Sequence, residues 1–193
     1  MLHRILSREE MEDANYSSQS NDVPADLSTA ERDLLLNTIK ERVPAQGRIV
    51  EWGSGGSTVL IADYKPRDAQ FISVEHNKRW YDKIIKFVFD NPSIEYLFVP
   101  ADGPFSAYGK IEEEDPTYLT KYIFTPENIK NTDIFFVDGV ARNSILNRIF
   151  QEAKIGAYVL LHDGYRDWYN DGMSHFKKII QVESLILSIK ETK

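Results

Sequence analysis

The sequence of 193 residues contains no cysteine. Thiol catalysis, disulfide bonds and thiolate metal sites are therefore excluded. No apolar stretch reaches the length of about 20 residues that a membrane-spanning helix needs, and the first residues lack the apolar core of a signal peptide. We therefore expect a cytoplasmic protein with no membrane partner.

Basic residues are in the minority. The chain has 30 acidic and 23 basic residues, which give a formal net charge of -7. Proteins that bind the nucleic-acid backbone need a basic face, so we expect no nucleic-acid partner, although a local basic patch is compatible with this balance. The length and the hydrophobic content of 42% are typical of one globular domain with a substantial core.

Five short apolar runs are rich in β-branched and aromatic residues, and an acid ends or closely follows each run. They cover residues 48–51, 71–75, 96–102, 134–138 and 158–163. Such runs, with little polar alternation, indicate parallel strands that are buried on both faces. The acids should therefore gather at the carboxyl edge of the sheet, where ligands bind in open α/β folds.

The segments between these runs complete an alternating strand and helix pattern. We predict strands over 48–52, 70–75, 94–99, 133–137 and 157–161 and near 185–189, and helices over about 58–64, 78–90 and 142–154 and near 173–180. A further helix should begin at the capping box Ser28-Thr29-Ala30-Glu31. Residues 1–27 are predicted to form an N-terminal arm, and residues 28–193 one domain in which 103–131 are an insertion over the site.

A glycine-rich turn, Glu51-Trp52-Gly53-Ser54-Gly55-Gly56-Ser57-Thr58, follows the first predicted strand. Glycines let a ligand approach the backbone closely, although a plain strand-to-helix turn is the alternative. The turn lacks the Lys-Ser/Thr end of a phosphate-binding loop, and the third glycine of a dinucleotide fingerprint falls on Thr58. Glu51 would repel a pyrophosphate, so a ligand with an ammonium and a sulfonium is favoured.

Glu51-x-Gly53-x-Gly55-x-Ser57 resembles the first motif of class I S-adenosylmethionine-dependent methyltransferases, and the similarity extends over residues 30–165. The resemblance implies a three-layer α/β fold with a mostly parallel, Rossmann-like sheet. Only about 30 residues follow Asp163. The C-terminal edge of the sheet could therefore be reduced.

The same resemblance implies S-adenosylmethionine as the cofactor. It assigns the methionine part to Glu51, Gly53, Gly55, Gly56 and Ser57, the ribose hydroxyls to Glu75, and the adenine to His76 and Asp102. A carboxylate can accept both ribose hydroxyls. The alternatives are a helix N-terminal acid for Glu75, an exposed loop histidine for His76 and a turn cap for Asp102.

Methyl transfer to a hydroxyl needs a base as well as alignment. Asp138 and His162, at the ends of adjacent predicted strands, are the candidate catalytic residues. Similarity to metal-dependent small-molecule O-methyltransferases implies a site for Mg²⁺ or Mn²⁺ at Asp138 and Asp163, although Gly164 stands where that group usually has an amide ligand. Without a metal, Asp138 or His162 would be the base; Asp138 as a helix cap is the alternative.

The acceptor is expected to be a small molecule or a sugar. Asp138-Gly139-Val140-Ala141-Arg142 resembles a run in small bacterial methyltransferase-like proteins that are distantly similar to plant enzymes that O-methylate cell-wall sugars. Arg142 would then bind an acidic or polyhydroxyl substrate, or form a surface salt bridge. Tyr108, Tyr165 and Trp168 are candidate stacking residues, with core packing as the alternative for each.

The resulting hypothesis is an S-adenosylmethionine-dependent methyltransferase, and specifically an O-methyltransferase. Two alternatives stay open. One is a non-catalytic cofactor-binding or partner-binding module of the same fold. The other is an NAD-dependent oxidoreductase, which Glu51 and Thr58 disfavour. The sequence does not indicate the methyl acceptor or the oligomeric state.

Overall fold

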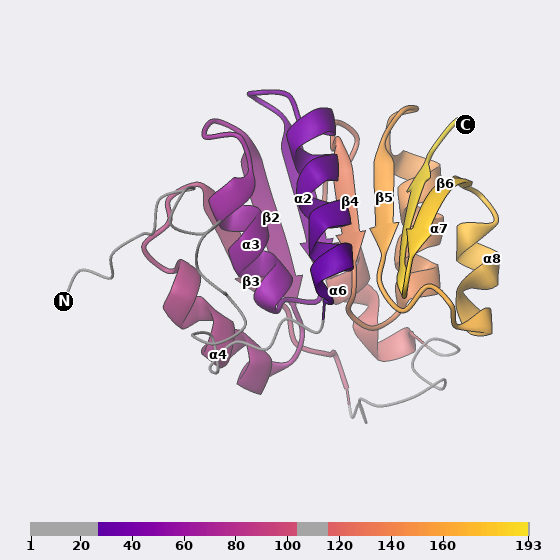
Figure 1. Ribbon diagram of the computed structural model, residues 1–193. Coiled ribbons are helices and arrows are strands. Elements are labelled where there is room, and N and C mark those ends of the chain that lie inside the picture. The colour runs from indigo at the N-terminus through magenta and orange to yellow at the C-terminus, as the bar shows by residue number, and fades with distance from the viewer. Residues whose placement is uncertain (1–26, 104–115, 193) are drawn as a thin grey trace.

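A computed structural model describes residues 27–103 and 116–192 and shows one twisted sheet between two layers of helices (Figure 1). The strands are β1 (Arg48–Trp52), β2 (Gln70–Glu75), β3 (Ile94–Phe98), β4 (Ile134–Val137), β5 (Tyr158–Leu161), β6 (Lys177–Val182) and β7 (Leu185–Ile189). The helices are α2 (Thr29–Arg42), α3 (Gly56–Tyr64), α4 (Lys78–Val88), α6 (Thr120–Phe124), α7 (Arg142–Glu152) and α8 (Asn170–Met173), with two 3₁₀ turns, Thr117–Leu119 and Asp167–Tyr169. The predicted α/β class is confirmed.

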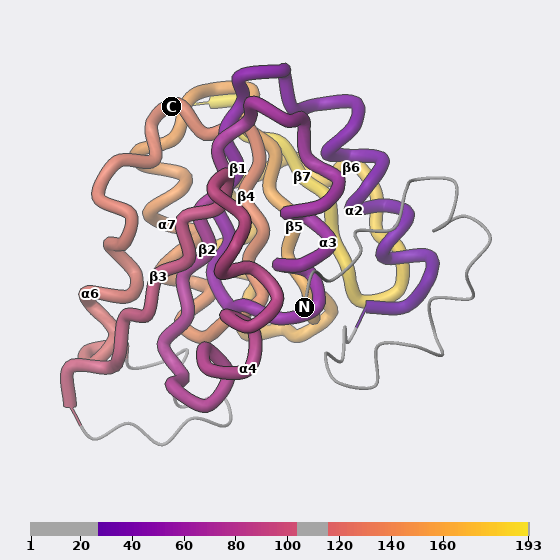
Figure 2. Tube along the Cα trace, turned by 90° about the vertical axis from the view of Figure 1, so that its left-hand side faces the viewer, coloured from indigo at the N-terminus to yellow at the C-terminus, as the bar shows by residue number. Residues whose placement is uncertain are grey.

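The strand order is β3-β2-β1-β4-β5-β7-β6. The first five strands in this order are parallel, and β7 is antiparallel to both β5 and β6. Because β1 pairs with β2 on one side and with β4 on the other, the strand order reverses between β1 and β4. Figure 2, turned by 90°, shows α2 and α3 on one face of the sheet and α6 and α7 on the other.

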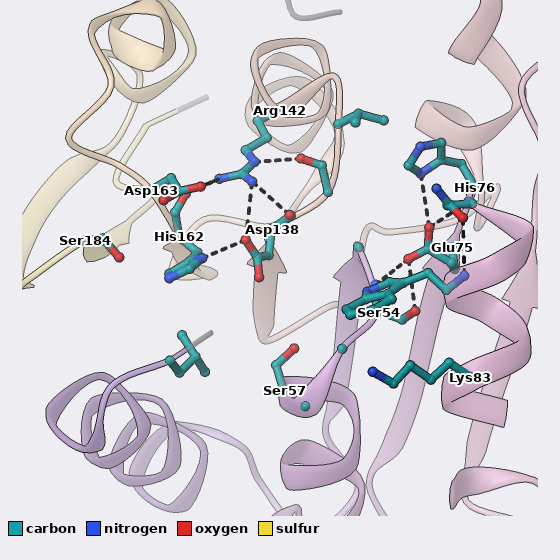
Figure 3. Close-up of a pocket in the computed structure, with 18 of the residues that line it drawn as sticks. Ser54, Ser57, Glu75, His76, Lys83, Asp138, Arg142, His162, Asp163 and Ser184 are labelled. Atoms are coloured by element: carbon teal, nitrogen blue, oxygen red, sulfur yellow. Dashed lines mark hydrogen bonds and ion pairs between the residues drawn. The ribbon is translucent and has the colours of Figure 1, made fainter. Parts of the chain in front are cut away.

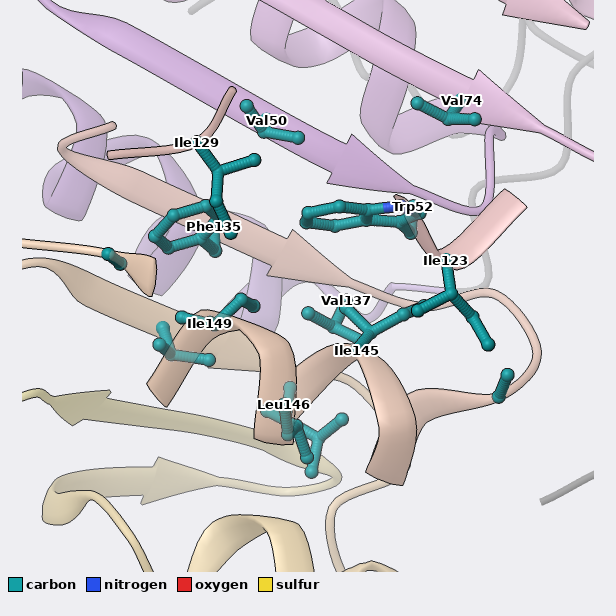
Figure 4. Close-up of a cluster of buried hydrophobic side chains, with 14 of the residues drawn as sticks. Val50, Trp52, Val74, Ile123, Ile129, Phe135, Val137, Ile145, Leu146 and Ile149 are labelled. Atoms are coloured by element: carbon teal, nitrogen blue, oxygen red, sulfur yellow. The ribbon is translucent and has the colours of Figure 1, made fainter. Parts of the chain in front are cut away.

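Both faces of the central strands are buried, which explains why their sequences do not alternate. Val50 and Trp52 belong to the core on the α7 side, whereas Ile49 belongs to the core on the α2 side. Figure 4 shows Trp52 and its neighbours facing Ile145 of α7. Each buried aliphatic or aromatic side chain contributes about 1.5–3 kcal/mol. This two-sided core holds the carboxyl ends of the strands in a fixed arrangement.

The predicted helix near 173–180 is wrong. Residues Asn170–Met173 form only the short α8, and Lys177–Val182 form the edge strand β6, which pairs with β7. Most of β6 is exposed, so its side chains carry no alternating pattern that would identify a strand. The C-terminal edge of the sheet therefore has its complete antiparallel hairpin, and what is short there is the helix.

The described half of the 103–131 insertion packs into the core. Leu119, Tyr122, Ile123 and Ile129 are buried on the α7 side of the sheet, and the Trp52 indole N–H donates to the Tyr122 carbonyl at 3.1 Å. Core packing therefore explains this half of the segment. The division of the chain at residue 27 and the placement of the insertion over the site stay predictions.

Among the described residues, no helix has both the length and the apolar character needed to cross a membrane.

Candidate active site

A pocket of about 1200 Å³ opens at the carboxyl edge of the sheet, at the point where the strand order reverses (Figure 3). It is bordered by the turn after β1, the beginning of α4, the ends of β4 and β5 and the loop after β5. The predicted site residues that line it are Gly53, Gly55, Gly56, Ser57, Glu75, His76, Asp138, Arg142, His162, Asp163, Tyr165 and Trp168. Glu51 and Asp102 are not among the lining residues, and Tyr108 lies outside the described part of the chain.

The floor of the pocket is backbone, because two turns meet there. Gly53 has a φ of 90°, and a Cβ added to it would lie 2.3 Å from the Gly139 nitrogen. A side chain at Gly53 is therefore excluded both by conformation and by the turn after β4. At Gly55 a Cβ would extend toward the Trp80 indole, whose Nε1 would lie at 3.9 Å. The floor thus offers close backbone approach to a ligand.

Glu75 is held in the pocket by a set of hydrogen bonds. The Ser54 backbone N–H and hydroxyl both donate to Glu75 Oε2, at 2.8 and 2.9 Å, and the Asn77 N–H donates to Oε1 at 2.7 Å. The Nδ1 atom of His76 lies 3.1 Å from Oε1. The carboxylate is 2% exposed yet lines the pocket, so its remaining acceptor capacity faces a ligand. Ser54 has no signal in the sequence beyond its place in the glycine turn.

Glu51 does not lie at the pocket surface. Its carboxylate is fully buried and accepts hydrogen bonds from the hydroxyls of Ser57, Thr58 and Ser73, at 2.6, 2.7 and 2.5 Å. Burial raises the pKa of Glu51 from 4.5 to about 7, against the lowering effect of the three hydroxyl donors. In this structure the acid ties β1 to α3 and β2, which is a structural role that differs from the predicted contact with the cofactor.

Asp102 is also engaged elsewhere. Its carboxylate forms a 2.6 Å ion pair with Lys121, and its backbone N–H donates to the Tyr118 carbonyl. The hydrogen bond and charge of Lys121 lower the pKa of Asp102. Contact of Asp102 with the adenine stays a prediction that the pocket lining does not support.

Asp138 and His162, from the ends of β4 and β5, form a hydrogen-bonded pair. His162 Nδ1 lies 2.8 Å from Asp138 Oδ1. An ionised carboxylate can only accept, so Nδ1 carries the proton and Nε2 has a free lone pair when the ring is neutral. Asp138 does not cap α7, whose N-cap is Ala141. The structure thus brings the two candidate residues together, and their catalytic role stays a prediction.

The Nε2 atom of His162 makes no hydrogen bond to any residue in the described ranges. It lies 4.0 Å from Glu31 Oε1, beyond hydrogen-bond distance. Glu31 itself accepts from the Ser184 N–H and Ser28 N–H, so the capping box of α2 borders the site. Burial lowers the pKa of His162, but the hydrogen bond and charge of Asp138 outweigh it, so this pKa is raised above 6.5.

Arg142 connects the two strand ends and is buried. Its Nε donates to the Gly139 carbonyl at 2.6 Å, and its terminal nitrogens donate to the carbonyls of His162 and Asp138. The same nitrogens lie 3.4 Å from Asp163 Oδ2 and 3.3 Å from Asp138 Oδ1. A guanidinium has five N–H groups, and these contacts use all five directions. Arg142 is thus neither a surface ion pair nor a free substrate ligand.

These contacts also decide how well a metal fits. Asp138, His162 and Asp163 each offer one ligand atom, and the three atoms lie within 4.8 Å of one another. Arg142 pairs with both carboxylates, and Arg166 lies 2.9 Å from Asp163 Oδ2. Two guanidinium groups already balance the two acids, and a divalent cation between them would be repelled at short range. The residues therefore do not fit a divalent metal.

Aromatic side chains form the wall beyond Asp163. Tyr165 and Trp168 line the pocket, as does Tyr169, whose ring lies 5.1 Å from the Arg142 guanidinium carbon. Tyr165 is 62% exposed, whereas Tyr169 is buried. Tyr165 is thus the aromatic residue here that is most available for stacking. Trp80 and the basic residues of α4 also line the pocket, and sequence reasoning assigned them only to a helix.

Comparison with known proteins gives a match in structure only. No family model and no curated protein matches the sequence. A methyltransferase from Geobacter sulfurreducens is similar with a TM-score of 0.61 and 13% identity, over 86% of this chain and 80% of that chain. This chain has the class I S-adenosylmethionine-dependent methyltransferase fold.

Two further matches to this methyltransferase fold were solved with a ligand. An O-methyltransferase from Bacillus cereus in complex with SAH has a TM-score of 0.59 and 13% identity, over 88% of this chain and 85% of that chain. An RNA methyltransferase from Salinibacter ruber in complex with S-adenosyl-L-homocysteine has a TM-score of 0.55 and 13% identity, over 88% of this chain and 96% of that chain. At this identity the likeness shows the fold and leaves the acceptor to the chemistry of the site.

Proposed function

We propose that this protein transfers a methyl group from S-adenosylmethionine to a hydroxyl of a small molecule or sugar, with His162 as the general base. The observation that carries the proposal is the 2.8 Å contact between His162 Nδ1 and Asp138 Oδ1, with Nε2 left free at the pocket. Asp138 fixes the tautomer and stabilises the imidazolium, as a buried carboxylate does in other histidine bases.

The pocket has groups that match the parts of this cofactor. Glu75 would accept a ribose hydroxyl, the glycine floor would contact the methionine part, and His76, which lines the pocket beside Glu75, would lie against the adenine. The cofactor would supply the methyl group on a positively charged sulfur. Glu75, which lines the pocket and forms no ion pair with a lysine or arginine of the described residues, favours such a cation over a pyrophosphate beside the glycine floor.

The protein's own residues would then perform the proton transfer. An acceptor hydroxyl placed beside Nε2 would lose its proton to His162 while the methyl group passes from the cofactor's sulfur to the acceptor oxygen, so that the carbon–sulfur bond breaks as the oxygen–carbon bond forms. The new imidazolium is stabilised by the Asp138 carboxylate. Arg142 holds Asp138 in place, because its guanidinium donates to the backbone carbonyl of Asp138 at 2.9 Å. Removal of one proton by a positioned base contributes about 10²–10⁴-fold to such reactions.

Calorimetry with S-adenosylhomocysteine and with NAD tests the cofactor assignment. We expect S-adenosylhomocysteine to bind and NAD not to bind. Binding of NAD alone would favour the oxidoreductase alternative. Binding of S-adenosylhomocysteine with no turnover on any sugar or small hydroxyl compound would favour the non-catalytic module.

Two variants test the base directly. His162→Gln and Asp138→Asn should keep the affinity for S-adenosylhomocysteine and lower turnover by about 10²–10⁴-fold. His175→Gln is the matched control, because His175 also bonds through a ring nitrogen, to Asn147 Oδ1 at 2.9 Å, but does not line the pocket. Native turnover in both site variants would show that the pair does not remove the proton.

A further inference from the structure

The cations that line the pocket fall into two groups. At the β4 and β5 end, Arg142 and Arg166 are paired with Asp138 and Asp163. At the opposite end, Arg79, Lys83 and Lys86 of α4 line the pocket and form no ion pair with any residue of 27–103 or 116–192. The pocket therefore has one end in which its positive charge is balanced and one in which it is not.

Arg79, Lys83 and Lys86, which we call the basic face of α4, share one side of the helix. Their spacing of four and then three residues places them within a narrow arc, along about 10 Å of the helix axis. Figure 3 shows Lys83 extending from α4 toward the glycine turn, on the side of Ser57. The Lys83 ammonium also lies 4.9 Å from the centre of the Trp80 ring, which orients it at the pocket.

The acidic charge that α4 itself supplies on this side is limited to Asp82, which also lines the pocket. This acid is paired with Lys78 at 2.6 Å. Asn77 caps the helix through its side-chain oxygen, and its backbone N–H donates to Glu75 Oε1 at 2.7 Å. Because the whole chain carries a net charge of -7, three cations that line one pocket and have no ion pair within the described residues are a local feature that the overall composition conceals.

We propose that the basic face of α4 binds the anionic part of the methyl acceptor, and that the acceptor is a small molecule with at least two phosphate or carboxylate groups. The statement that this ligand is the acceptor rests on the proposed function. S-adenosylmethionine has a single carboxylate, which does not account for three cations. A pocket of about 1200 Å³ exceeds the usual range of about 300–1,000 Å³ for one small ligand, so it has room for a second.

The surroundings favour a small anion over a nucleic-acid strand. Glu75 also lines the pocket, has no lysine or arginine partner among the described residues, and would repel a chain of phosphates that continued past α4. A backbone binder needs a basic surface that extends beyond one helix face. An acceptor with its charges at one end satisfies both conditions, because α4 and His162 line the same pocket and the neutral hydroxyl end would extend toward His162.

Binding of tripolyphosphate and of citrate, measured by calorimetry at low salt, tests the proposal and separates phosphate from carboxylate ligands. Lys83→Gln and Lys86→Gln should each weaken binding by about fivefold, and the triple change with Arg79→Gln by about a hundredfold. Lys40→Gln is the matched control, because Lys40 is likewise an exposed lysine in the last turn of a helix but lies away from the pocket. It should leave the affinity unchanged.

Three outcomes would overturn the proposal. The first is an equal loss in Lys40→Gln, which would mean that only net charge matters. The second is no binding of either anion by the native protein at about millimolar concentration. The third is tighter binding of a single-stranded RNA oligonucleotide than of tripolyphosphate, with a steep dependence on salt.

Binding of S-adenosylhomocysteine, measured with the same proteins, distinguishes a failure of this proposal from a failure of the proposed function. The triple variant should bind it as the native protein does while losing the anions. A parallel loss would assign the basic face to the cofactor and overturn the assignment to the acceptor. If the native protein binds anions but not S-adenosylhomocysteine, the proposed function fails while the anion site stands.

Discussion

The Ser54 hydroxyl donates a 2.9 Å hydrogen bond to Glu75 Oε2, the atom that also accepts the Ser54 backbone N–H. The same hydroxyl is 2.7 Å from the Tyr96 hydroxyl. Ser54 therefore occupies acceptor capacity on Glu75 that two ribose hydroxyls would need. For both hydroxyls to bind, the Ser54 side chain has to give up Glu75 and keep Tyr96 as its partner.

Glu75→Gln and Ser54→Ala should therefore act in opposite directions on cofactor affinity. Replacing one carboxylate oxygen with an amide should weaken S-adenosylhomocysteine binding by about 1–3 kcal/mol, the range for hydrogen bonds to a charged group. Removing the competing hydroxyl should leave the affinity equal or higher. Calorimetry measures both, and unchanged affinity in Glu75→Gln would leave Glu75 with only a structural role.

The pKa of His162 can be measured by NMR without knowing the acceptor. We expect it above 6.5 in the native protein, because Asp138 outweighs the effect of burial, and lower in Asp138→Asn. A folded-state pKa above the unfolded value means that protonated His162 stabilises the fold. This stabilisation is complete below about pH 6.5 and is lost as the pH rises through the folded pKa. Turnover should rise over the same range, since the base must be neutral.

Arg142→Met should destabilise the protein by about 1–3 kcal/mol, because the carbonyls of Gly139, His162 and Asp138 and the partly buried Asp138 carboxylate lose their charged donor. In the native protein, excess chelator should change neither the melting temperature nor turnover, and Mn²⁺ should not bind. In Arg142→Met, Mn²⁺ should raise the melting temperature, because Asp138 then has no guanidinium beside it and Arg166 alone remains, paired with Asp163. If chelator removed the activity of the native protein and Mg²⁺ or Mn²⁺ restored it, the conclusion that these residues do not fit a divalent metal would be wrong.

Glu51→Gln should stabilise the protein at high pH. Because the pKa of Glu51 is raised to about 7, the folded state binds more protons than the unfolded state between pH 4.5 and 7, and stability falls across that window. The amide removes this ionisation, so urea unfolding at pH 8 should show a gain of about 2–4 kcal/mol, less any cost in hydrogen-bond geometry. A large loss of S-adenosylhomocysteine affinity would instead support the predicted contact between Glu51 and the ammonium group of the cofactor.

The strands and the glycine turn were predictable because they depend on local patterns. Runs such as 134–137 are apolar throughout, since a strand covered on both faces has no polar side. The turn after β1 needs glycine at Gly53 for its positive φ. Acids at the ends of parallel strands necessarily share one edge. This is why Asp138 and His162 were found together. The strand β6 was not predicted, because this exposed edge strand is specified by its pairing with β7 and not by a local pattern in its own sequence.

The sequence by itself determined the fold, the edge of the sheet that carries the site and most of the side chains at that edge. Tertiary structure decided which of those side chains face the pocket and which are used up inside the protein. Glu51 accepts hydrogen bonds from three buried hydroxyls, and Arg142 bonds to residues at the ends of two strands. Lys83, by contrast, has no acidic partner among the described residues. The physical reason is that a buried charge takes whatever partners the packing brings near it, and those partners can lie far away in the chain.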